Sequence, residues 1–291
     1  MGSVLMNHKP VMSTNTFSLK LQQPFNLRMT VESHGWCQIA PWHWDGRSLE
    51  RTVRIGTNAE WARVHQPSED QLLIETSSSS TDAVSERVAR WLQLDWDPSE
   101  FLALCDRNDP AIARFIRSGG GRFLRGDTFF EDLIKTVCTI NTTWKQTKSM
   151  VASLVALGDG LFPEPGELQT IGPRRLAEEC KLGFRARTVD TVTDQLLQDQ
   201  AIQTDGSAHS DIIDYDYLIS LKGIGPYAAA HTMMLMRDFE TLPVDSEVST
   251  YLRQQGFDPK DAQSAFQHWG EYRFLGYKLK RIVDEENWIG E

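Results

Sequence analysis

Residues 218–229 read Leu-Ile-Ser-Leu-Lys-Gly-Ile-Gly-Pro-Tyr-Ala-Ala, a turn with two glycines that joins two helical patterns. Glycine is needed where the backbone takes a positive φ or approaches a ligand closely. Proline costs nothing at the first helical position, where the N–H has no intrahelical partner. The segment therefore predicts a helix–hairpin–helix whose exposed main-chain N–H groups suit a phosphate. An ordinary pair of helices with a glycine-rich turn is the alternative.

A carboxylate stands at the next predicted helix start. Asp245 follows Leu242-Pro243-Val244, eighteen residues after Tyr227. Aspartate is a preferred N-cap residue, and taken alone this position predicts a cap. A fixed carboxylate in a dry site can also stabilise positive charge on a sugar or activate water. The two roles are compatible, because a helix start favours a negative charge.

The predicted secondary structure changes along the chain from strands to helices. Alternating patterns from Phe17 to Thr76 predict strands, with a hairpin turn at Asp45-Gly46 and a short strand over 61–64. We expect an α+β fold, in which an antiparallel β domain precedes a mainly helical region. The expected organisation is a loose tail over 1–21, a β-rich domain over 22–104 and the helical region over 105–291. Predicted helices cover 84–92, 146–157, 174–180, 187–198, 215–221, 226–236, 246–255 and 261–282.

Charge and cysteine content limit the possible functions. The net charge of −10 argues against a nucleic-acid protein, yet residues 101–200 carry thirteen basic and thirteen acidic side chains. Distant carboxylates are screened beyond about 10 Å, so local cations decide phosphate contact. The four scattered cysteines indicate buried thiols in a reducing compartment. The sequence also shows neither a membrane span nor a secretory signal.

Together, the hairpin and Asp245 resemble the helix–hairpin–helix, Gly/Pro-Asp (HhH-GPD) superfamily of DNA glycosylases. The likeness is greatest to its alkylpurine (3-methyladenine) and 8-oxoguanine branches, and it covers roughly residues 22–285. Further similar segments are Pro24–Leu27, Trp42–Gly46, Phe130–Trp144, Phe162–Pro165 and Leu182–Arg187.

The resemblance implies that the helical region forms two lobes around a DNA-facing cleft. It also implies roles for single residues. Asp245 would be the catalytic carboxylate. Tyr227 stands where strand-nicking members have a lysine that forms a Schiff base, so we expect a monofunctional enzyme that uses water. Tyr227 would stack on an extruded base, and Trp269 and Tyr272 would lie in a C-terminal helix that closes the base pocket.

The resemblance also implies a DNA-binding surface. Asn141 would contact the orphaned partner base, with Gln146 close behind. Trp144 is a possible wedge, although packing beneath its helix is the more common role of tryptophan. The remaining expected DNA contacts are Lys145, Lys148, Arg185, Lys222, Gly223, Ile224 and Gly225.

We therefore expect a monomeric base-excision repair enzyme that hydrolyses a damaged purine, preferably an alkylated one, from duplex DNA. No cysteine follows Cys180, so an iron–sulfur cluster is not expected, and no metal site is predicted. The hairpin carbonyl groups could hold a monovalent cation. The expected location is the cytoplasm or nucleoid of a bacterium, or the nucleus of a eukaryote. Two alternatives are an 8-oxoguanine-type glycosylase with lyase activity and a non-catalytic binder of damaged or abasic DNA.

Overall fold

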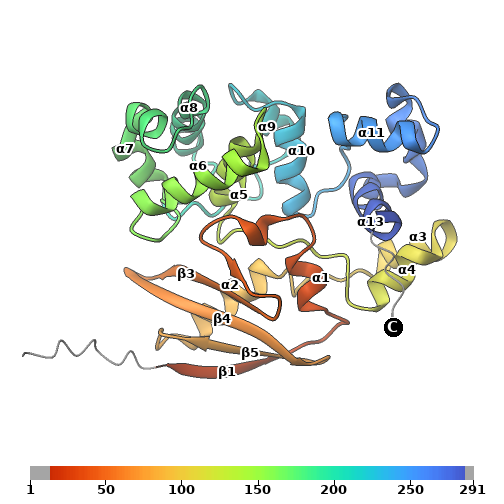
Figure 1. The fold of residues 1–291 in the computed structure, drawn as a ribbon, viewed down its shortest axis with the longest axis horizontal. Helices are drawn as coiled ribbons and strands as arrows, with labels where there is room; N and C mark the ends of the chain where they lie inside the picture. Colours follow the sequence, from red (N-terminus) through yellow and green to blue (C-terminus); the bar gives the residue numbers. More distant parts are fainter. Residues whose placement is uncertain (1–13, 286–291) are drawn as a thin grey trace, which may run out of the picture.

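The computed structural model describes residues 14–285. A five-stranded sheet lies beside two groups of helices. The chain passes from the sheet into one group, crosses to the other and then returns to the first (Figure 1). The strands are β1 (Asn15–Lys20), β2 (His43–Trp44), β3 (Ser48–Ile55), β4 (Asn58–Ser68) and β5 (Gln71–Thr76). The helices before the turn at residue 158 are α1 (Leu27–Val31), η1 (Trp36–Gln38), α2 (Thr81–Trp91), α3 (Ser99–Asn108), α4 (Pro110–Arg117), α5 (Phe129–Thr139) and α6 (Trp144–Leu157).

The second half of the described chain is helical apart from its loops. Its elements are α7 (Pro165–Glu178), α8 (Arg185–Gln198), α9 (Tyr215–Ser220), α10 (Pro226–Leu235), α11 (Ser246–Gln254), η2 (Pro259–Asp261), α12 (Ala262–Ala265), η3 (Gln267–Tyr272) and α13 (Arg273–Glu285). The expected α+β class is confirmed by this order of elements. Within residues 14–285, no helix has the length and apolar character needed to cross a bilayer.

The sheet has the order β1-β5-β4-β3-β2, and each neighbouring pair is antiparallel. Alternate residues of β3, β4 and β5 are buried, as strands with one face on a core require. β1 pairs with β5 along its whole length, so the expectation of a loose tail is wrong for residues 15–20. The rest of the predicted tail up to residue 13 lies outside the described residues. β4 is also longer than the predicted strand over 61–64.

The predicted hairpin turn at Asp45-Gly46 joins β2 to β3. The Asp45 carboxylate accepts hydrogen bonds from the N–H groups of Arg47 (2.8 Å) and Ser48 (2.7 Å), a local bond pattern typical of aspartate in turns. Behind the sheet, α2 buries Val84, Val88 and Trp91, the apolar stripe predicted from its helical spacing.

A buried ionic cluster joins the sheet to α5. The Arg51 guanidinium on β3 donates twice to the Glu131 carboxylate (2.8 and 3.1 Å), and Lys135 donates to it from one turn later (2.5 Å). Burial alone would raise the pKa of Glu131, but Arg51 and Lys135 outweigh it and lower this pKa to about 2. The cluster therefore holds α5, and the loop that follows it, in a defined position on the sheet.

The two helical groups draw on distant parts of the chain. One contains α5 to α10, and the other packs α3 and α4 against η3 and α13 (Figure 1). The predicted boundary between residues 104 and 105 falls inside α3, and this helix belongs with the C-terminal group. The Phe101 ring on α3 contacts the rings of Trp269 and Tyr272.

Two predicted helices differ from the structure. The segment 261–282 is broken into several pieces, because Gly270 takes φ +58° and ψ −126° and interrupts the helical path. The predicted short helix over 174–180 belongs to the longer α7, which bends at Gly172 (φ +72°). Both breaks occur at glycine, the residue that adopts a positive φ without steric cost.

Candidate active site

The segment between α9 and α10 forms the predicted helix–hairpin–helix. Ile224 is buried, and its N–H donates to the Leu221 carbonyl (3.0 Å), while Lys222 and Gly223 are exposed. Gly225 is the N-cap of α10, and Pro226 takes the first helical position. The first turn of α10 therefore faces outward beside the turn, in the arrangement that suits an anion.

The two glycines of the hairpin have different requirements. Gly223 has φ +96°, and a Cβ there would lie 2.7 Å from Cγ2 of Thr188. Gly225 has φ −104°, and a Cβ there would meet nothing within 4 Å. Gly223 is thus required by conformation and close packing, whereas at Gly225 the glycine leaves open space in front of the backbone.

Asp245 is the N-cap of α11, as the sequence predicts. Its Oδ1 accepts a hydrogen bond from the Val248 N–H (2.8 Å), which fixes the carboxylate at the helix start. The side chain is partly exposed rather than enclosed in the interior. The Asp245 charge also contributes to the raised pKa of Tyr227, so the acid lies close enough to α10 to affect its first turn.

A cavity of about 490 Å³ lies between α10, α11, α13, the α5–α6 loop and the segment before η1. This volume is within the range of small-molecule sites. The described residues that line the cavity are Ser33, His34, Gly35, Trp36, Thr139, Thr142, Trp144, Thr147, Tyr227, His231, Glu247, Lys278, Arg281 and Ile282.

Tyr227, which the sequence predicts for a base pocket, lies in the wall of this cavity. Its hydroxyl is hydrogen-bonded to Thr139 Oγ1 (3.2 Å), and its ring stacks on His231 with centroids 5.7 Å apart. Burial raises the pKa of the Tyr227 phenol, and the carboxylates of Asp245 and Glu247 act in the same direction. The side chain is thus a neutral, fixed aromatic surface in the wall of the cavity.

Trp269 and Tyr272 do not line this cavity. Trp269 is 2% exposed and lies against Phe101 and the backbone of Gly276, where a Cβ would be 2.5 Å from the indole. The Tyr272 hydroxyl donates to Glu100 (3.0 Å). Both residues join α3 to the C-terminal helices, so their predicted place in the base pocket is wrong.

The α5–α6 loop presents Asn141 at the rim of the cavity. Asn141 is exposed and has φ +47°, and its neighbour Thr142 lines the cavity. The buried Arg185 guanidinium donates to the carbonyls of Ile140 and Asn141, the latter at 2.9 Å. Arg185 therefore positions the loop and does not face a phosphate.

The other predicted DNA contacts lie on α6. Lys145 and Lys148 are exposed there. Gln146 is exposed too, but its Oε1 accepts a hydrogen bond from the Thr143 N–H (3.1 Å) and completes a capping box. Trp144 donates a hydrogen bond from Nε1 to Gln38 (3.0 Å) and packs over Gly35. These contacts correspond to the predicted packing role and not to insertion into the base stack.

The sequence did not indicate several residues of this surface. Phe184 is 63% exposed, and the Arg185 guanidinium lies 4.5 Å from its ring centroid. Because Arg185 also holds the Asn141 loop, this exposed ring lies beside that loop. In the cavity, His231 could have been found one turn after Tyr227. The other missed residues come from distant segments and are His34, Trp36, Glu247, Lys278 and Arg281.

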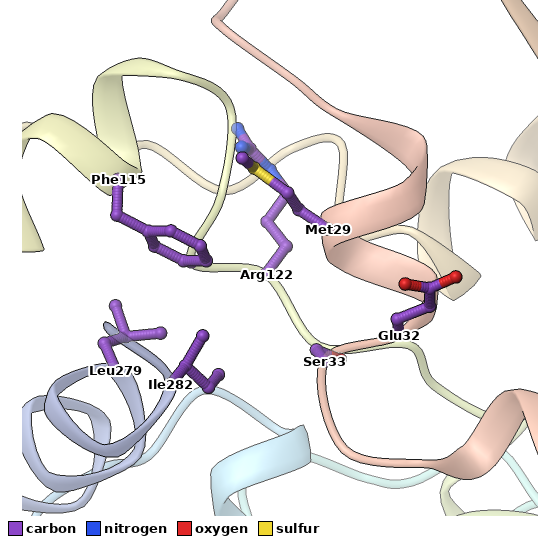
Figure 2. A pocket seen from close by; sticks show the side chains of 8 residues that line it. Met29, Glu32, Ser33, Phe115, Arg122, Leu279 and Ile282 are labelled. Atoms are coloured by element: carbon purple, nitrogen blue, oxygen red, sulfur yellow. The ribbon is translucent and has the colours of Figure 1, made fainter. Parts of the chain in front are cut away.

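A second hollow adjoins the cavity and shares Ser33 and Ile282 with it. Figure 2 shows Phe115, Leu279 and Ile282 on one side of this hollow and Met29 with Arg122 on the other. Its volume is about 10 Å³, enough for roughly one water molecule. It is too small for a base, so the larger cavity is the candidate site.

The expected absence of an iron–sulfur cluster and of a metal site stays a prediction. Cys37, Cys105, Cys138 and Cys180 are buried free thiols. Among the residues that the structure describes, no group of three His, Cys, Asp or Glu side chains could hold a metal. A monovalent cation at the hairpin stays a prediction, and the Leu221 carbonyl there already accepts the Ile224 N–H.

The same fold is found in solved DNA glycosylases. The 3-methyladenine DNA-glycosylase from Archaeoglobus fulgidus superposes with a TM-score of 0.72 at 17% identity, covering 94% of this chain and all of that one. The apo form of Clostridium acetobutylicum 8-oxoguanine glycosylase/lyase has a TM-score of 0.69 at 16% identity, and the match covers 91% of this chain and 94% of that one. MBOgg1 in complex with a low-affinity DNA ligand has a TM-score of 0.67 at 20% identity, and the match covers 93% of this chain and 99% of that one.

The comparisons by sequence give no match. No protein-family model matches the chain, and no curated protein does. The predicted resemblance is therefore confirmed at the level of the fold, which this chain shares with solved DNA glycosylases.

Proposed function

We propose that this protein is a DNA glycosylase of base-excision repair, which hydrolyses the N-glycosidic bond of a damaged base flipped out of duplex DNA. The observation that carries the proposal is the position of Asp245. It caps α11 at its start, and α11 contributes Glu247 to the wall of a base-sized, aromatic-lined cavity. The fold shared with known glycosylases supports this assignment.

The chemistry follows from the charge that develops on the sugar. Cleavage of a glycosidic bond builds positive charge on the ring, and a fixed carboxylate stabilises that charge or activates a water molecule. Oδ1 of Asp245 is held by the Val248 N–H, so the carboxylate is oriented before DNA binds. Preorganisation of this kind avoids a reorientation cost during the reaction.

The reaction proposed here is monofunctional. Strand cleavage through a Schiff base needs an amine at the sugar. At the hairpin position this chain has Tyr227, whose phenol is kept neutral by burial and bonded to Thr139. Water would then be the nucleophile, and the product would be an abasic site.

The exposed residues around the cavity suit a duplex with one nucleotide extruded. The hairpin at Gly223 and Gly225 and the lysines Lys145, Lys148 and Lys222 would contact phosphates. Asn141 would fill the vacated position in the stack, and the exposed Phe184 ring would stack on a neighbouring base. Base–aromatic stacking contributes about 1–3 kcal/mol per base, which offsets part of the cost of unstacking.

The direct test is base release from a panel of duplexes, each with one modified base, measured as alkali-revealed abasic sites. Asp245→Asn is the matched variant, because asparagine can still cap α11 while it lacks the charge. We expect base release by the wild type and a rate lower by at least about 10²-fold in Asp245→Asn. Binding by both forms without release by either would favour a non-catalytic DNA-binding protein.

A second measurement tests the monofunctional mechanism. Borohydride reduces a Schiff base to a stable covalent adduct, so wild-type protein incubated with lesion-containing DNA and borohydride should give no adduct. A trapped adduct would instead support the glycosylase/lyase alternative.

A further inference from the structure

The last residue of α5, Thr139, borders the candidate base cavity. Its hydroxyl donates to the Thr136 carbonyl oxygen one turn earlier (2.6 Å). A carbonyl only accepts hydrogen bonds, so the single proton of the Thr139 hydroxyl is used in this contact. The oxygen of Thr139 is therefore left as an acceptor.

The Tyr227 hydroxyl meets this acceptor. Its oxygen lies 3.2 Å from Thr139 Oγ1, and because the Thr139 proton is already used, Tyr227 is the donor. The Tyr227 ring also stacks on His231, with centroids 5.7 Å apart and an angle of 24° between the ring planes. The ring is thus held at its hydroxyl end by α5 and along one face by a neighbour on its own helix, α10.

The acceptor belongs to a segment that other helices hold on both sides. Thr147 of α6 donates from Oγ1 to the Cys138 carbonyl oxygen (3.1 Å). Arg185 of α8 donates from Nε to the Ile140 carbonyl oxygen (2.9 Å). The residues before and after Thr139 are therefore fixed through their backbones. Supporting bonds of this kind keep a binding site in its productive geometry.

The bond between Tyr227 and Thr139 is partly buried. Burial raises the pKa of the Tyr227 phenol, so the proton that makes this bond stays in place at physiological pH. A hydrogen bond shielded from water is stronger than one in bulk solvent. The bond also joins two elements of the site, because α10 begins at the hairpin and α5 leads into the Asn141 loop.

Resting on the proposed function, we propose that Thr139 is a positioning residue, which holds the Tyr227 ring in the orientation that receives the flipped base. Thr139 acts through the phenol and does not itself take part in the chemistry. The base stacked on Tyr227 places its sugar at Asp245, so a turned ring misplaces the scissile bond relative to the carboxylate. A misplacement of about 1 Å can lower a rate by about 10²-fold.

Three variants test the bond from both ends. Thr139→Val keeps the shape of the side chain but removes the acceptor, whereas Tyr227→Phe keeps the ring but removes the donor, and the double variant removes both. We expect the single-turnover rate of base release to fall about 10-fold in all three, because each lacks the bond that orients the ring. Release by Thr139→Ser, which keeps a hydroxyl, should stay within a few-fold of wild type.

The free energy of unfolding separates positioning from structural support. In Thr139→Val the Tyr227 hydroxyl loses its partner, which lowers stability. Replacing both partners by apolar groups is close to neutral, so urea denaturation of the double variant should show that this loss is recovered. A rate of base release that recovers together with stability in the double variant would assign Thr139 a structural role only and would overturn the inference.

Binding to a duplex with an abasic-site analogue is the control for DNA affinity, because this duplex has no base to place in the cavity. Its affinity for Thr139→Val should stay within a few-fold of wild type, and a loss as large as the loss of rate would overturn the inference. If the wild type releases a base and all variants match its rate, the inference is overturned while the glycosylase assignment stands. If the wild type releases no base from any duplex, both are overturned.

Discussion

The two hairpin glycines should respond in opposite ways to alanine. In Gly223→Ala, the added Cβ meets Thr188 at 2.7 Å from Cγ2 and 2.8 Å from Oγ1, and the residue must keep φ +96°. Overpacking of this kind costs about 1–3 kcal/mol, and an unfavourable positive φ adds about 1–3 kcal/mol. We therefore expect Gly223→Ala to lower the free energy of unfolding by about 2–5 kcal/mol.

Gly225→Ala is the matched control for stability. At φ −104° with open space around the new Cβ, the free energy of unfolding should be unchanged or raised by up to about 1 kcal/mol. Its affinity for duplex DNA should nevertheless fall, because the methyl group occupies the space through which a phosphate approaches the first turn of α10. Urea denaturation and DNA titration at constant salt measure the two effects separately.

A double-mutant cycle with Thr188→Ala tests the packing part of this explanation. Removing Cγ2 and Oγ1 should recover about 1–3 kcal/mol in the Gly223→Ala background, leaving the cost of the backbone conformation. The explanation is refuted if Gly223→Ala unfolds at the same urea concentration as wild type, or if Thr188→Ala recovers none of the loss.

Three further predictions concern the core and the proposed DNA-binding surface. Glu131→Gln should cost about 3–5 kcal/mol in urea denaturation, because it leaves Arg51 and Lys135 buried without their carboxylate. Folding lowers the pKa of Glu131 from 4.5 to about 2. The contribution of Glu131 to wild-type stability is therefore complete above pH 4.5 and is lost as the pH falls toward 2. A free energy of unfolding that does not change with pH over this range would contradict the role of the cluster. Phe184→Ala should weaken binding to lesion-containing duplex about 10-fold with the melting temperature unchanged, and unaltered affinity would remove Phe184 from the interface. Trp269→Phe should lower stability by up to about 3 kcal/mol while the folded protein releases base at the wild-type rate, and a selective loss of release would return Trp269 to the base pocket.

The hairpin and the acid could be predicted from the sequence because their signals are local. Gly223, Gly225 and Pro226 encode a turn within a few residues, and Asp245 has the side chain of an N-cap at a helix start. The alternating pattern of the strands and the apolar stripe of α2 are also signals carried by residues close together in the sequence.

The walls of the cavity could not be predicted in this way. His34 and Lys278 line the same cavity from distant parts of the chain, and no periodicity relates them. The spacing of Trp269 and Tyr272 is compatible with a pocket wall, but it is equally compatible with the core contact to α3 that the structure shows. Only the packing of α3 beside α13 decides between the two.

The most direct measurement is a crystal structure of Asp245→Asn bound to a duplex with one base that the wild type releases. We predict that this base lies in the cavity against Tyr227, with the sugar carbon of the scissile bond next to residue 245 and a phosphate at the Gly225 turn. A base that remains stacked in the duplex, or one held away from residue 245, would contradict a single site built from the hairpin, the acid and the cavity.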